Sequence, residues 1–185
     1  MDDNSYTCRY CNSKNLEAYK KINNYTISYC NNCNLISTNP HFGGQSSLVN
    51  SEWYSDNYIS KYIDRAESLK ERFRLRILEI ESIKRGGKIL DLGSGVGLFL
   101  ESMVESARFN WELYGVEINR KLVSVAKKRI GQKITKLYLG NLASLKLHKN
   151  FFDCVTCFDV LEHDGNLKKT LSELKRILKP SGLLI

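Results

Sequence analysis

The sequence lacks any apolar run approaching the roughly 20 residues that a membrane-spanning helix needs. Its first residues, Met1-Asp2-Asp3-Asn4, are acidic and polar, which is the wrong chemistry for a secretory signal. The composition, 42% hydrophobic and 26% charged over 185 residues, is that of a globular chain with room for one medium domain and a small module. We therefore expect a cytoplasmic protein with no membrane segment.

Carboxylates are missing from residues 120–149, which hold nine lysines and arginines and account for much of the net charge of +8. A basic band of this kind can hold phosphate backbones. It can equally be the solvated face of a helix and a strand, and we favour that interpretation. Residues 1–50 are almost neutral, so the N-terminal part of the chain lacks the charge expected of a module that reads nucleic acid.

Four of the six cysteines form two C-x2-C pairs separated by 18 residues, the spacing of a structural zinc site. They are Cys8, Cys11, Cys30 and Cys33. Between the pairs, 16–22 and 25–29 predict a hairpin that turns at Asn23-Asn24, so the segment is expected to be a zinc ribbon. Two disulfides are the alternative, disfavoured in a reducing cytosol.

The other two cysteines, Cys154 and Cys157, also have the C-x2-C spacing. They lie in a predicted strand, 152–158, where positions three apart point to opposite faces. We expect two buried thiols there and no metal site.

The rest of the chain predicts an α/β fold. A polar linker, 41–51, precedes an amphipathic helix from about 58 to 84, ended by Gly86-Gly87. Strand and helix patterns then alternate, which indicates a Rossmann-like parallel sheet with helices on both faces. The strands are expected at 88–92, 112–117, 133–139 and 152–158, and the helices at 97–107, 120–130 (N-cap Asn119, C-cap Gly131) and 166–179.

These patterns divide the chain into three parts. We expect a zinc ribbon at 1–40, a linker and leading helix at 41–86, and the α/β domain at 87–185. The sequence stops as a fifth strand begins at Ser181, so the sheet is expected to be incomplete at its C-terminal end.

The most informative segment is DLGSGVG at 91–97, which joins the first predicted strand of this domain to the next helix. Its glycines let the backbone turn sharply and let a ligand approach closely. The helix that follows offers free N–H groups to a negative group. A nicotinamide-binding loop is the alternative, but it more typically shows G-x-G-x-x-G without an acidic residue at the strand end.

Three further segments follow in order: GVE at 115–117, DVLEH at 159–163 and RILKPSG at 176–182. With the glycine loop, this series closely resembles the class I S-adenosylmethionine (SAM)-dependent methyltransferases. The resemblance extends through the fifth strand of the seven in that family. With the N-terminal cysteines included, the chain also resembles a subfamily of these enzymes that carries a zinc ribbon, and this resemblance covers nearly the whole chain. Members of that subfamily often modify sugars, polysaccharides or other small molecules.

The resemblance implies a SAM site at the carboxyl ends of the first strands. Glu117 would accept hydrogen bonds from both ribose hydroxyls. Asn141 stands where the family usually carries an aspartate at the adenine amino group, so weaker binding is expected there. The residues expected to hold the methionine portion and the rest of the cofactor are Asp91, Gly93, Ser94, Gly95, Gly97, Leu142 and Phe158.

The DVLEH segment is expected to face the transferred methyl group. His163 is the best candidate for a base if the acceptor must lose a proton, with Asp159 beside it. Similar ubiquinone-type methyltransferases can bind a divalent cation here, so Asp159, Glu162 and His163 could do the same. A capped loop with no catalytic role is the alternative.

Three functions remain open from the sequence. The first is a SAM-dependent methyltransferase of a small molecule, such as a sugar or polysaccharide precursor. The second is an rRNA or tRNA methyltransferase that uses the ribbon and the basic band 120–149. The third is a truncated SAM-binding or interaction module without turnover. An incomplete sheet would also expose the apolar edge 183–185 and favour self-association or mark a fragment of a longer protein.

Overall fold

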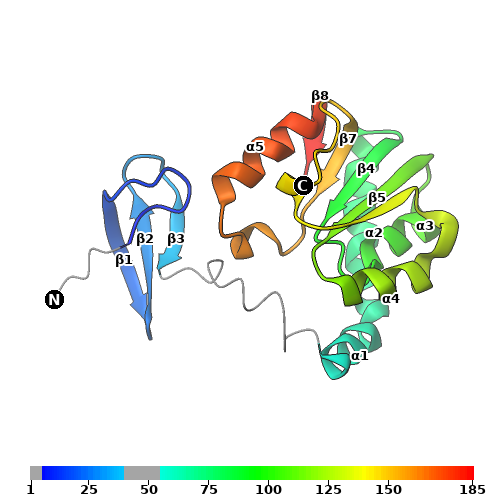
Figure 1. Cartoon of the computed structure of the whole chain (residues 1–185), viewed down its shortest axis with the longest axis horizontal. Coiled ribbons are helices and arrows are strands. Elements are labelled where there is room, and N and C mark those ends of the chain that lie inside the picture. The colour runs from blue at the N-terminus through cyan, green and yellow to red at the C-terminus, as the bar shows by residue number, and fades with distance from the viewer. Residues whose placement is uncertain (1–5, 40–54) are drawn as a thin grey trace.

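The computed structural model describes residues 6–39 and 55–185 (Figure 1). The described residues form a small antiparallel sheet of three strands and a parallel sheet of five strands with helices. The predicted linker, 41–51, lies outside them. No helix among the described residues is long and apolar enough to cross a lipid bilayer.

The small sheet follows the cysteine pattern. Strands β1 (Leu16–Ile22) and β2 (Tyr25–Cys30) form the predicted hairpin, and Asn23 takes the left-handed backbone conformation in its turn. A third strand, β3 (Ile36–Asn39), pairs with the other edge of β2 and was not predicted. The second cysteine pair therefore lies at the end of β2 and in the turn that leads to β3.

The single helix predicted from about 58 to 84 is wrong. The chain forms α1 (Asp56–Asp64) and α2 (Ala66–Ile83), separated by a turn at Arg65, whose ψ of 8° leaves the helical range. The three- and four-residue apolar spacing continues through this turn, so periodicity alone did not reveal the break. Helix α2 also ends before the two glycines, with Lys84 as its C-cap in an extended conformation.

The large sheet has the strand order β6-β5-β4-β7-β8, and all of its pairs are parallel. This order confirms the Rossmann-like fold. The chain reverses direction across the sheet between β4 and β7, the point where such sheets bind ligands. The strands are β4 (Gly87–Leu92), β5 (Trp111–Glu117), β6 (Lys136–Leu139), β7 (Phe152–Thr156) and β8 (Leu178–Leu184).

Capping residues set the helix between β5 and β6. Helix α4 (Arg120–Ile130) has the predicted bounds, because the Asn119 side chain accepts hydrogen bonds from two first-turn amides and Gly131 ends the helix with a φ of +62°. The other helices are α3 (Leu98–Ser106) and α5 (Leu167–Ile177), and short 3-10 turns occupy Gly131–Lys133, Leu142–Ser144 and Leu161–His163.

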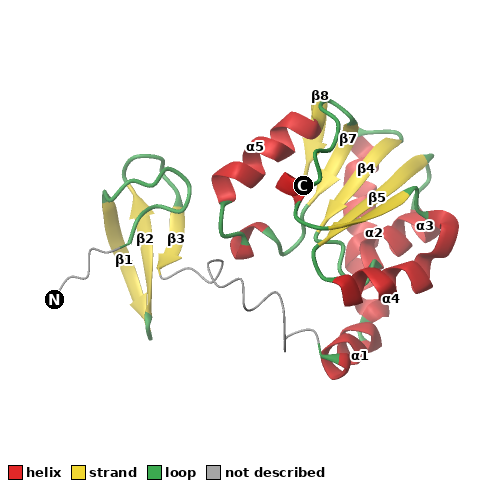
Figure 2. Ribbon diagram, in the orientation of Figure 1, coloured by secondary structure: helices red, strands yellow, loops and turns green. Residues whose placement is uncertain are grey.

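Helices lie on both faces of the large sheet (Figure 2), and apolar side chains pack between the sheet and these helices. On one face, Ile89 and Cys154 pack with α2 and α3. On the other face, Leu90 and Val155 pack with α5. Cys157 packs on this second face, so the two cysteines point to opposite sides as predicted, but β7 ends at Thr156 and Cys157 is half-buried, whereas Cys154 is buried.

Strand β8 differs from its prediction and lies at the edge of the sheet. It begins at Leu178 and includes Pro180, so the helix predicted to reach 179 ends earlier, at Ile177. An edge strand tolerates proline because one row of its N–H groups needs no ladder partner. The far side of β8 has no strand neighbour in the described part of the chain, and Leu184 is 41% exposed. Self-association through this edge stays a prediction.

Candidate functional site

The four N-terminal cysteines converge at the end of the small sheet. Their sulfur atoms all lie within 4.8 Å of one another, with the Sγ atoms of Cys8 and Cys33 3.5 Å apart and those of Cys11 and Cys30 3.6 Å apart. These separations exclude disulfides, whose sulfur atoms are about 2.05 Å apart. Four thiolates bound to one zinc ion at about 2.3 Å lie about 3.8 Å from each other. The donor set therefore fits tetrahedral zinc.

The two cysteine pairs have the same local geometry. In each, the residue after the second cysteine is an asparagine with positive φ, Asn12 at 59° and Asn34 at 63°. Each asparagine donates its backbone N–H to the carbonyl of the first cysteine at 2.8 Å. Asparagine adopts this conformation more readily than most residues. Both turns thus aim two thiols at one point.

The glycine loop lies at the carboxyl ends of β4 and β5. The amides of Gly93 and Ser94 both donate to the carbonyl of Val116, at 2.8 and 3.0 Å, which holds the loop over β5. Gly95 has a φ of +54°, and a Cβ there would find only the Gly93 carbonyl oxygen, at 3.9 Å. The loop thus leaves open space above Gly95, as a cradle for SAM requires. Gly97 follows as the N-cap residue of α3.

Glu117 ends β5 beside this loop. One carboxylate oxygen accepts the amide of Gly95 at 2.9 Å, and the other accepts the amide of Asn119 at 2.8 Å. A carboxylate has about four acceptor positions. Two therefore remain for a ligand, which is the number that a pair of ribose hydroxyls needs. The sequence-based role of Glu117 fits this geometry and stays a prediction.

Asp91 is buried near the end of β4, with 4% of its surface exposed. Burial raises the pKa of its carboxyl group to about 7, with a smaller contribution in the same direction from the nearby Glu117. A hydrogen bond from the Thr156 hydroxyl, at 2.7 Å, opposes this shift. A carboxyl group with this pKa is about half protonated at neutral pH.

The raised pKa of Asp91 predicts a pH dependence of SAM binding. A cationic ligand favours the ionised carboxylate, and below pH 7 the free protein holds a proton that binding must release. Affinity should therefore rise with pH, by about tenfold between pH 6 and pH 8, because the ionised fraction rises from about a tenth to about nine tenths. Calorimetric titration at both pH values measures this change.

Asp91→Asn controls for titration of the ligand itself. This variant should show a flatter pH profile than the unmodified protein. A wild-type dissociation constant that is equal at the two pH values would contradict the role given to Asp91.

Of the other side chains predicted to contact the cofactor, two already have partners within the chain and two are buried. The side-chain oxygen of Asn141 accepts the amide of Ala143 at 2.9 Å and so caps the next turn. Leu142 is buried, and Ser94 is buried with its hydroxyl unpaired among the described residues. Phe158 packs against the rings of Phe73 and Phe99, with centroids 5.5 and 5.2 Å away.

The DVLEH segment forms a loop and a 3-10 turn after β7. Asp159, Glu162 and His163 are all exposed, and Asp159 has a φ of +54°. The imidazole Nε2 of His163 lies 4.0 Å from a carboxylate oxygen of Glu162. Among the described residues, the four thiols are the only group of three or more metal-binding side chains that converge. This structure therefore does not bring the three DVLEH side chains together as a cation site.

A contact that the sequence did not predict joins the cysteine-rich turn to this loop. Arg9 lies between Cys8 and Cys11, and its guanidinium donates hydrogen bonds to three carbonyl groups at 2.6–3.1 Å. The acceptors belong to Leu161, Glu162 and Asp164. No local signal could have revealed a contact between residues more than 150 positions apart.

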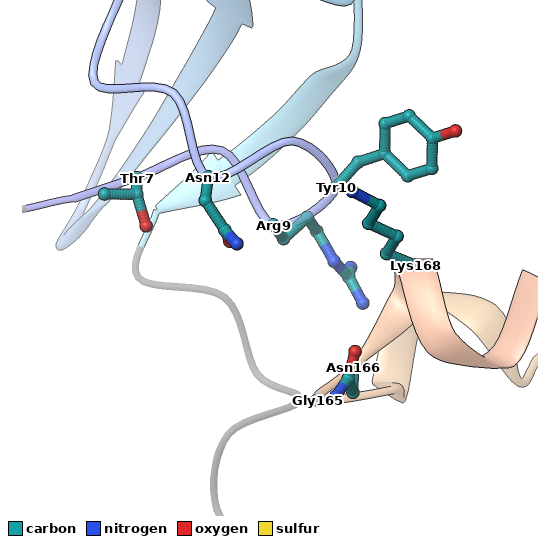
Figure 3. Close-up of a pocket in the computed structure, with 7 residues that line it drawn as sticks. All are labelled: Thr7, Arg9, Tyr10, Asn12, Gly165, Asn166 and Lys168. Carbon is teal, nitrogen blue, oxygen red and sulfur yellow. The ribbon is translucent and has the colours of Figure 1, made fainter. Parts of the chain in front are cut away.

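A cavity of about 270 Å³ lies beside this contact, between the first cysteine turn and the start of α5 (Figure 3). Polar and cationic side chains predominate in its lining. The lining residues are Thr7, Arg9, Tyr10, Asn12, Gly165, Asn166 and Lys168. Tyr10 supplies its one aromatic ring, and no carboxylate belongs to it.

Curated methyltransferases match more than half of the chain. The demethylmenaquinone methyltransferase of Bacillus velezensis is 25% identical over 118 residues, 62% of this chain and 51% of that protein. The ubiquinone/menaquinone biosynthesis C-methyltransferase UbiE of Burkholderia mallei is 28% identical over 103 residues, 55% of this chain and 42% of that protein. The chain thus spans about half the length of these curated relatives.

Solved structures share the fold. Phosphoethanolamine N-methyltransferase 2 of Haemonchus contortus, in complex with SAM, superposes with a TM-score of 0.59 at 21% identity. The match covers 75% of this chain and 34% of that protein. Residues 90–185, more than half of the chain, match the family model of the methyltransferase domain. With the glycine loop after β4 and Glu117 at the end of β5, this match shows that the chain belongs to the SAM-dependent methyltransferase family.

Proposed function

We propose that this protein transfers a methyl group from SAM to a polar small molecule of the sugar or polysaccharide-precursor class. The observation that carries the proposal is the contact between the Glu117 carboxylate and the Gly95 amide. It brings a hydrogen-bond acceptor for the ribose hydroxyls and an open glycine turn together at the carboxyl ends of β4 and β5. When bound there, SAM would supply an electrophilic methyl group.

The chain's own residues would prepare the acceptor. His163 is the candidate to take the proton of an acceptor hydroxyl at Nε2, and this atom lies 4.0 Å from the Glu162 carboxylate. Both residues belong to the loop that follows β7, and in parallel sheets the loops after the carboxyl ends of the strands lie on one side of the sheet, which supports a role near the glycine loop. Orientation of the acceptor contributes the larger part of the rate in a displacement of this kind.

The cavity beside Arg9 supports a polar acceptor. Its hydroxyl, amide and cationic side chains suit hydroxyl-rich or anionic groups, whereas an isoprenoid quinone needs an apolar lining. The charge pattern supports a small molecule over RNA, because part of the basic band is neutralised within the chain. Lys121 pairs with Asp56, and Arg129 pairs with Glu101.

Release of S-adenosylhomocysteine in the presence of different acceptors tests this function. We expect turnover above the acceptor-free background with nucleotide-activated sugars and none with a demethylated quinone. Lys168→Glu should lower kcat/KM for the acceptor by about tenfold, since it reverses a cation in the cavity lining. Lys175→Glu, an exposed change later in α5, is the matched control and should have no effect. Turnover with the quinone alone would overturn the proposed acceptor class.

A further inference from the structure

The hydrogen bonds of Arg9 connect the four-cysteine site to the loop after β7 that carries Glu162 and His163. Arg9 sits within the cysteine turn, and its Nη1 atom donates to the Glu162 carbonyl at 3.1 Å. Its Nη2 atom donates to the carbonyls of Leu161 at 2.9 Å and Asp164 at 2.6 Å. We infer that Arg9 is a positioning residue, through which the four-cysteine site orders the loop that carries Glu162 and His163. This inference rests on the proposed function for its catalytic consequence, but not for the coupling itself.

The cysteine turn determines where the guanidinium can reach. The Cys8 amide bonds to the Ser13 carbonyl, and the Asn12 amide bonds to the Cys8 carbonyl, each at 2.8 Å. A metal bound by four thiolates would cross-link this turn to β2 and fix the backbone of Arg9. Without that cross-link, Arg9 would have to be ordered by its own three hydrogen bonds, at a large cost in side-chain and backbone entropy.

Contacts within the α/β part hold this loop at both ends. At its start, Val160 packs so closely on the glycine loop that a Cβ on Gly93 would overlap it, and Leu161 packs against the core. At its end, the Asp164 carboxylate accepts the amide of Asn166 at 2.6 Å. Between these ends, the 3-10 turn has two backbone hydrogen bonds, to the carbonyls of Val160 at 3.0 Å and Leu161 at 3.3 Å. The three carbonyls that Arg9 binds belong to this short turn. Guanidinium hydrogen bonds are charge-assisted, so they are strong enough to decide its order.

Hydrogen exchange in the full chain tests the coupling through a cycle of four states. The states are the wild-type protein and Arg9→Ala, each with zinc and after removal of zinc by a chelator. In the wild type, removing zinc should speed exchange at the His163 and Asp164 amides by at least tenfold. In Arg9→Ala, these amides should exchange fast already, and removing zinc should add nothing. Such non-additivity is the signature of two groups that act through one contact.

Two further variants complete the exchange experiment. Arg9→Lys should restore part of the protection, since an ammonium group can donate to some of the same carbonyls. Lys20→Ala, an exposed change on β1, should behave as the wild type. An equal effect of zinc removal in the wild type and in Arg9→Ala, or no effect on the loop in either, would overturn the inference.

A functional measurement separates positioning from general stability. Arg9→Ala should bind SAM within about twofold of the wild type, because the guanidinium hydrogen bonds go to the loop after β7 and not to the residues that would hold the cofactor. Its turnover of a nucleotide-activated sugar should fall at least tenfold, mainly in kcat, with partial recovery in Arg9→Lys. A loss of SAM affinity equal to the loss of turnover would overturn the positioning role. Failure of the wild type to bind SAM would instead refute the proposed function, and the exchange cycle would still report on the coupling.

Discussion

Replacing Cys30 with serine is expected to abolish zinc binding and unfold residues 6–39. Cys30 is fully buried at the end of β2, and its sulfur lies 3.6 Å from that of Cys11. Structural zinc in small modules contributes roughly 10–16 kcal/mol of apparent binding free energy, which is also folding free energy. The small sheet has few buried apolar side chains to replace that contribution. Elemental analysis and the dispersion of amide NMR signals measure the two effects.

The same experiment has an internal control. Cys157→Ala removes a thiol outside the cluster and should keep one zinc ion per chain. Signals of the large sheet should persist in Cys30→Ser, because that sheet has its own core on both faces. Protein purified without chelator that contains no zinc, yet has an ordered small sheet, would contradict the metal site.

Glu117→Ala is expected to weaken SAM binding by about 100-fold or more. Two charge-assisted hydrogen bonds to the ribose, each worth about 1.5–3 kcal/mol, would be lost. The substitution also releases the amides of Gly95 and Asn119, so the loop itself loses an anchor. Calorimetric titration of the variant with SAM and with S-adenosylhomocysteine measures the change.

Two variants separate these contributions. Glu117→Gln keeps one acceptor oxygen without the charge and should lose less affinity than Glu117→Ala. Glu112→Ala lies on the same strand but near its other end, where its carboxylate pairs with Lys88 at the surface, and should leave affinity unchanged. An unchanged dissociation constant in Glu117→Ala would move the ribose site elsewhere.

Local chemistry explains which features could be predicted from the sequence. Helix α4 has the predicted bounds because Asn119 and Gly131 act through their own neighbours. The four thiols converge because each C-x2-C turn is a local structure. In contrast, the turn at Arg65 left no trace in the apolar spacing, and β8 includes Pro180 only because it lies at the sheet edge.

In the candidate site, too, local features could be predicted and long-range contacts could not. The glycine loop and Glu117 were predicted because the order of the motifs and the ends of the strands can be recognised in the sequence. The contact of Arg9 with the loop after β7 was not predicted, because it joins the cysteine turn to a loop more than 150 residues away in the sequence. The burial of Asp91 against Thr156 also depends on strand pairing across 65 residues. Long-range packing of this kind decides the electrostatics of the site without a local signature.

Calorimetric titration of the full chain with SAM measures whether the carboxyl ends of β4 and β5 form a SAM site. We expect saturable binding of one SAM per chain, with competition by S-adenosylhomocysteine and amide shifts centred on Gly93–Gly97 and Glu117. Absence of binding by protein whose large sheet gives well-dispersed amide signals would contradict it.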